Sequence, residues 1–126
     1  MTPAIQKAIE EIRKAYPHNR IDAEDDGNNG AYVKVHDVPL EGPFHQVSTW
    51  VGFQITNPYP YCDIYPLFVR ADLSRRDGNA LGEGLSVGNF RSEVAVQISR
   101  RSNRHNPAVD KAVHKLLKVI KWLNSL

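Results

Sequence analysis

The clearest pattern in the chain is alternation of apolar and polar residues through its middle. From Gln46 to Ile55, every second residue starting at Val47 is apolar or threonine. The same period of two recurs more briefly at Tyr32–Val38, Leu67–Leu73 and Glu93–Ser99. One apolar and one wetter face per strand is typical of antiparallel sheets. We therefore predict four strands in an antiparallel meander.

A longer apolar period flanks these strands at both ends of the chain. Between Thr2 and Tyr16, isoleucines recur at helical spacing, with Thr2 as a cap and Pro3 at the first helical position. A second helix is predicted to open at Asn106 and Pro107. Its apolar side is made by Val109, Val113, Leu116, Leu117, Ile120 and Leu123. The predicted fold class is thus α+β: an N-terminal helix, a four-stranded meander and a C-terminal helix.

Three segments lack either period and are predicted to be loops. Asp22–Gly30 is almost entirely polar, and Ser74–Asn89 contains four glycines. Asn57–Pro66 carries three prolines and three tyrosines in ten residues, which regular structure does not accommodate. No linker or repeat interrupts the chain, so residues 1–126 are expected to form one domain.

Composition narrows the class of protein further. No apolar run approaches the ~20 residues that cross a bilayer, and the N-terminus lacks the blocks of a signal peptide. The single cysteine, Cys62, excludes an internal disulfide and suits a reducing compartment. We therefore expect a cytoplasmic protein without a membrane segment.

Two motifs give a family resemblance. Tyr59-Pro60-Tyr61 precedes Pro66 and a strand, and Ile98-Ser99-Arg100-Arg101 precedes Asp110 and the last helix. This order resembles the ubiquitin-conjugating fold, and most closely divergent bacterial members associated with ubiquitin-like modifier operons. The resemblance implies a ubiquitin-like protein and its activating enzyme as partners, and it implies no cofactor.

The usual catalytic cysteine of that family is missing. The corresponding stretch reads Gly82-Glu83-Gly84-Leu85-Ser86-Val87, without the family's His-Pro-Asn tripeptide. Thioester transfer needs a nucleophile, and two acyl acceptors are conceivable. Ser86 lies near the family's cysteine position, with His105 as a base; Cys62 is the only thiol, with His45 or His36 as a base. The chain is accordingly either a noncanonical carrier or a binding protein of such a pathway.

The candidate binding residues fall in two segments. They are Tyr59, Pro60, Tyr61 and Tyr65 in the proline-rich turn, and Arg100, Arg101, Arg104 and His105 before the last helix. Tyrosine and proline offer rigid contact area, and arginine forks bind oxyanions. We expect Arg100 or Arg101 to pair with Asp110 or Asp72.

An alternative function is a small non-enzymatic binding module with a basic C-terminal patch. From Arg91 onward the chain holds eight Lys/Arg residues against two acidic ones, whereas Asp22–Glu41 is acidic. Such a patch suits an acidic protein or nucleic acid. Nucleic acid is the less favoured partner, because no aromatic residues are interleaved for base stacking. The histidines show no metal-ligand spacing, so no metal site is predicted.

Overall fold

The computed structural model describes residues 1–126 as two helices and one six-stranded antiparallel sheet. The elements are α1 (Pro3–Ala15), β1 (Ile21–Asp25), β2 (Ala31–Pro39), β3 (Ser48–Ile55), β4 (Leu67–Arg70), β5 (Leu85–Phe90), β6 (Glu93–Ile98) and α2 (Ala112–Asn124). The strand order is β1-β2-β3-β4-β6-β5, so β1 and β5 are the two edges. The α+β class is confirmed, and neither helix has the length and apolar character to span a bilayer.

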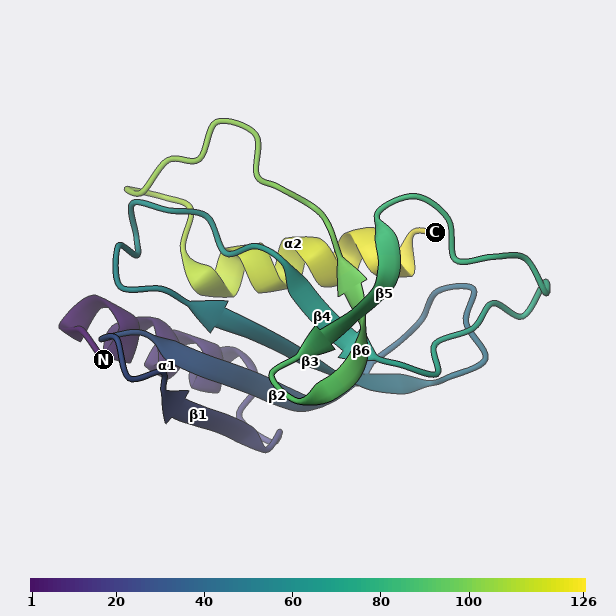
Figure 1. The fold of residues 1–126 in the computed structure, drawn as a ribbon, viewed down its shortest axis with the longest axis horizontal. Helices are drawn as coiled ribbons and strands as arrows, with labels where there is room; N and C mark the ends of the chain where they lie inside the picture. Colours follow the sequence, from purple (N-terminus) through teal and green to yellow (C-terminus); the bar gives the residue numbers. More distant parts are fainter.

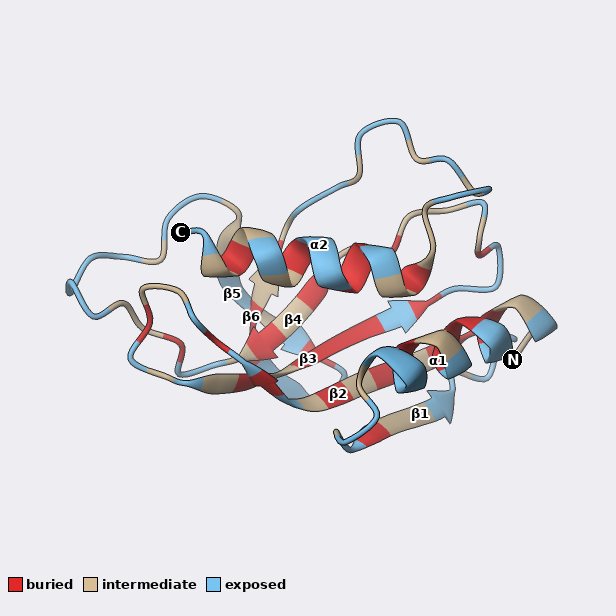
Figure 2. Ribbon diagram, turned by 180° about the vertical axis from the view of Figure 1, so that it is seen from behind, coloured by how far each residue is buried: buried red, intermediate tan, exposed pale blue.

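Both helices cover the same face of the sheet (Figures 1 and 2). The isoleucine stripe of α1 is buried, and Leu116, Val119 and Leu123 are buried on α2. They meet the inward side of the strands, where Val33, Phe53, Val69 and Ile98 are almost inaccessible. The core is therefore a single, largely aliphatic layer between the helices and the sheet, with Phe53 among its aromatic members.

The opposite face carries an aromatic cluster under the β5–β6 hairpin. Figure 1 shows this hairpin crossing in front of the sheet, on the side away from the helices. Phe90 at its tip packs against Tyr32, Trp50 and Phe68, with ring centroids 5.5–6.2 Å apart. A Cβ on Gly52 would lie 2.7 Å from the Phe90 ring, so glycine allows this approach. The tip is thus packed onto the sheet rather than free.

The predicted four-stranded meander is wrong, because two further strands form. β1 covers the first four residues of the segment predicted as a polar loop, and β5 begins inside the predicted glycine-rich loop. β1 is an edge strand and buries only Ile21, so its acidic residues remain in water and obscure the alternation. β5 is also an edge, with Ser86 and Val87 both exposed. Alternation of apolar and polar residues predicts a strand only when one of its faces is buried. β1 and β5 each bury a single residue, so their sequences show little alternation.

Two boundaries differ from the prediction by three residues or more. The last helix begins at Ala112 rather than at Asn106, because Lys111 has extended backbone angles and forms the N-cap. Asn106 instead caps a separate turn, in which its side chain accepts a hydrogen bond from the Ala108 N–H at 3.0 Å. The third predicted strand ends at Arg70 instead of Leu73.

Candidate binding surface at the start of α2

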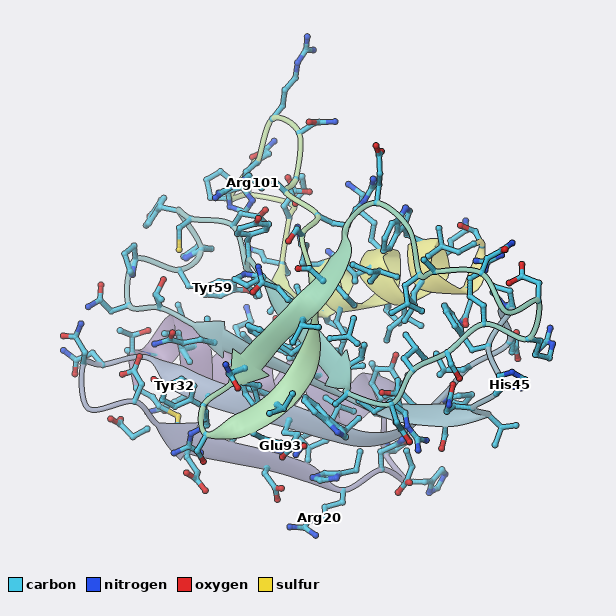
Figure 3. All side chains as sticks on the ribbon, turned by 45° about the vertical axis from the view of Figure 1, so that its right-hand side comes forward. Arg20, Tyr32, His45, Tyr59, Glu93 and Arg101 are labelled. Atoms are coloured by element: carbon cyan, nitrogen blue, oxygen red, sulfur yellow. The ribbon has the colours of Figure 1, made fainter.

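Two distant segments with the predicted binding residues meet beside the first turn of α2. We call residues 57–66 the Tyr-Pro segment and residues 99–105 the basic loop. His105 Nε2 lies 2.7 Å from the carbonyl oxygen of Pro60. The guanidinium of Arg101 lies over the ring of Tyr65, 3.9 Å from its centroid. Figure 3 shows Arg101 above Tyr59, on the same side of the molecule. The two sets of candidate residues therefore form one surface.

A buried ion pair fastens this junction to α2. Lys115 Nζ donates to Asp63 Oδ2 at 3.0 Å, to the Arg100 carbonyl at 2.7 Å and to Ser102 Oγ at 3.1 Å. Asp63 also accepts from the Ser102 N–H at 2.7 Å and from its hydroxyl at 2.9 Å. The side chains of Lys115 and Asp63 are only 8% and 17% exposed. All three donors of the ammonium are satisfied, as a buried lysine requires.

The electrostatics of Asp63 follow from these contacts. Burial alone would raise the pKa of this carboxyl, but the hydrogen bonds from Ser102 and the charge of Lys115 outweigh it. The pKa of Asp63 therefore lies below its ordinary value, and the group is a carboxylate at neutral pH. This carboxylate holds the middle of the basic loop at Ser102.

Tyr59 is buried beneath this surface and bonds the first residue of α2. Its hydroxyl accepts a hydrogen bond from the Ala112 N–H at 2.9 Å, and the residue is only 6% exposed. Burial raises the pKa of this phenol, the Ala112 N–H opposes that rise, and the negative charge of Glu11 adds to it. Tyr59 satisfies one of the otherwise unpaired N–H groups of the helix end. It was predicted to contact a partner, but the structure places it in the core.

The remaining candidates present a cationic outer surface. Tyr61 is 79% exposed, and Arg100, Arg101 and Arg104 are exposed. Arg100 lies over the Trp122 ring, 4.7 Å from its centroid. The three arginines form no ion pair with an acidic side chain. Their charges are therefore available to an anionic partner.

The expected pairing of Arg100 or Arg101 with Asp72 or Asp110 is wrong. Asp72 pairs with Arg70, which is two residues away on the same turn. Asp110 accepts a hydrogen bond from the Asn106 N–H at 2.6 Å. Stacking on aromatic rings, rather than ion pairing, holds both arginines.

Cys62 lines a small hollow at the same junction. The hollow has a volume of about 40 Å³, and its walls include Cys62, His105 and His114 together with Asp63 and Lys115. The thiol contacts the Thr56 hydroxyl at 3.3 Å and is partly exposed. Nδ1 of His105 is buried and has no hydrogen-bond partner. The only thiol of the chain thus shares a hollow with two imidazoles.

The other predicted acyl acceptor has different surroundings. Ser86 lies on the edge strand β5, opposite Gln97, and not in a loop. His105, its predicted base, contacts the Tyr-Pro segment instead. The two bases suggested for Cys62 are also elsewhere: His36 bonds Asp22 at 2.8 Å, and His45 lies at the far end of the molecule from Tyr59 (Figure 3).

Sequence reasoning missed the residues that assemble the surface. Asp63, Ser102 and Lys115 carry no motif, and Lys115 looks like one more lysine on a solvated helix face. The only sign in the sequence that Lys115 is buried is its position directly before Leu116, on the apolar side of the helix. No group of three His, Cys, Asp or Glu residues is placed to hold a metal ion.

No protein-family model, curated protein or solved structure matches this chain.

Proposed function

We propose that this chain is a protein-binding component of a ubiquitin-like modifier pathway, and that it binds the modifier or its activating enzyme. The proposal combines the sequence resemblance with one structural observation. The Tyr-Pro segment and the basic loop, which carry that resemblance, join into one exposed surface.

The chemistry of the surface favours an acidic protein partner. Arg101 and Arg104 present guanidinium groups without internal carboxylate partners, and Tyr61 adds a largely exposed ring on the neighbouring Tyr-Pro segment. Arginine and tyrosine are the residues that most often dominate protein interfaces. The hydrogen bonds of Asp63 and Lys115 already order the basic loop, so less conformational entropy is lost when a partner binds. A partner with a carboxylate-rich patch fits this surface.

Titration against the ubiquitin-like proteins and activating enzymes of the encoding organism tests the proposal. Arg101→Glu and Arg104→Glu are expected to weaken binding, because each replaces an attraction by a repulsion. Lys14→Glu on the exposed side of α1 makes the same change in charge away from the surface and is the control. Equal effects of all three variants would contradict the proposal. Binding of DNA or RNA, with affinity that falls steeply with salt, would support the alternative module instead.

A second function, acyl carriage by Cys62, is favoured by its hollow. The Cys62 thiolate would attack the carbonyl carbon of a modifier thioester on the activating enzyme. A new C–S bond forms, the old C–S bond breaks, and the departing thiolate takes up the proton that Cys62 released. His105 and His114, which share the hollow, are the candidate bases.

A charging assay separates carriage from binding alone. The chain is mixed with ATP, activating enzyme and modifier, and adducts are detected by intact mass and on non-reducing gels. An adduct lost in Cys62→Ala but kept in Ser86→Ala supports carriage by Cys62. If the activating enzyme is charged and the chain acquires no adduct, carriage is refuted and the binding proposal is judged by titration.

A further inference from the structure

The strand β5 forms an open and uncharged edge of the sheet. It is the last strand in the order, and its only strand partner is β6. Its sequence, Leu85-Ser86-Val87-Gly88-Asn89-Phe90, contains no charged residue and no proline. Val87 is 86% exposed. Proteins normally protect such an edge with charges, prolines or a covering element, because its free backbone groups pair with other strands.

The other edge of the same sheet is protected in this way. β1 carries Asp22, Glu24 and Asp25, so pairing of two β1 strands would bring carboxylates together. The two edges of the sheet therefore differ in charge: β1 carries three carboxylates, and β5 carries no charged residue. Only β5 lacks a barrier to strand addition.

The hydrogen bonds of the β5–β6 ladder identify which backbone groups are free. The Ser99 N–H donates to the Gly84 carbonyl at 2.8 Å, so this facing pair is a hydrogen-bonded one. Hydrogen-bonded and non-hydrogen-bonded pairs alternate along an antiparallel ladder. The backbone groups of Ser86 and Gly88 therefore point to β6. Those of Val87 and Asn89 and the carbonyl of Leu85 point outward and are free, whereas the Leu85 N–H donates to the Gly82 carbonyl at 3.4 Å. These free groups, on three alternate residues, form a template for another strand.

We propose that β5 pairs with β5 of a second copy of this chain, antiparallel and centred on Val87. In this register Val87 faces Val87 of the other copy, and Leu85 faces Asn89. It is the one self-pairing that uses all three outward positions of both strands. It also sets Glu83 opposite Arg91, so the flanking charges attract rather than repel. The twofold axis makes the interface isologous, and the two sheets become continuous.

A second copy fits this edge better than a charged peptide does. Self-pairing places no like charges opposite each other, and the exposed Val87 gains an apolar neighbour across the axis. Val94, 57% exposed, lies on the same side of the hairpin, because its facing residue is Asn89 and not Ser86. The pairing therefore also extends an apolar strip that is otherwise in water.

Sedimentation equilibrium from micromolar to millimolar protein tests the proposal. The average mass should rise from 14.2 kDa toward twice that value. Val87→Lys should weaken the association at least about tenfold, because it places two lysines face to face at the axis. Val47→Lys changes another largely exposed valine, outside β5, and should have no effect. A mass that stays at 14.2 kDa, or equal weakening by both variants, overturns the proposal.

Cross-linking tests the register. In a Cys62→Ser background, Val87→Cys should form an intermolecular disulfide, since facing Cα atoms of a hydrogen-bonded pair lie about 5.5 Å apart. Asn89→Cys places the two thiols several residues apart along the strands and should not cross-link. Cross-linking of Asn89→Cys but not of Val87→Cys would refute this register. The outcome is independent of modifier binding, because the cross-link is measured on the purified chain without any modifier.

Discussion

Removal of the Asp63 charge should destabilise the chain and loosen the proposed binding surface. Asp63→Asn keeps the size of the side chain but leaves the buried ammonium of Lys115 without its carboxylate. Breaking a buried ion pair from one side costs about 3–5 kcal/mol. Lys115 keeps two neutral acceptors, the Arg100 carbonyl and Ser102 Oγ. We therefore expect a loss near the lower end, about 3 kcal/mol.

Urea denaturation measures this loss as a change in the free energy of unfolding. Against a total of about 5–15 kcal/mol, about 3 kcal/mol is easily resolved. Lys115→Met removes the other charge, and the double variant completes a cycle. The double variant should lose clearly less than the sum of the two single losses, because neither charge is then left unpaired. A loss below about 0.5 kcal/mol, typical of surface substitutions, or strictly additive losses, would refute the buried pair.

The pH dependence gives an independent signature. The pKa of Asp63 is lower in the folded chain than its ordinary 3.8. Its contribution to stability is therefore complete above the ordinary pKa and is lost as the pH falls through the folded pKa. The difference in unfolding free energy between the parent chain and Asp63→Asn should shrink on acidification. A difference that is constant from neutral pH to acid would contradict the assignment.

Three further predictions concern other parts of the structure. Gly52→Ala should destabilise by about 1–3 kcal/mol in urea denaturation, because its Cβ collides with Phe90; an unchanged stability would contradict the packed hairpin. Tyr59→Phe should cost about 1–3 kcal/mol, because it leaves the buried Ala112 N–H unpaired; a neutral effect would contradict that bond. Hydrogen bonds from the Arg75 guanidinium and from the Asn79 N–H lower the pKa of Asp77 to about 2. An NMR titration that gives a pKa near 3.8 would contradict this.

The sequence predicts the covered parts of the fold better than the edges. The helical stripe of α1 and the alternation of β3 both report contact with the core, and both elements form as expected. β1 and β5 have little covered face, so burial leaves little imprint on their sequences. The start of α2 was misplaced because Asn106 and Pro107 also suit a turn, and the extended Lys111 separates that turn from the helix.

The sequence marks candidate residues for the surface by type, but not the contacts that assemble it. Tyrosine, proline and arginine mark two candidate segments by type, yet their contact depends on the chain returning beside α2. The residues that create this contact, Asp63 and Lys115, lie 52 positions apart and carry no local pattern. Stacking of Arg101 on Tyr65 likewise needs the folded geometry, since sequence alone favours an acidic partner for an arginine.

Binding of a fluorescently labelled ubiquitin-like protein from the encoding organism, with and without its activating enzyme, tests the central claim most directly. The account predicts a saturable complex that survives moderate salt, is weakened by Arg101→Glu and is unchanged by Lys14→Glu. No complex with any such protein, while the chain is folded by circular dichroism, would contradict it.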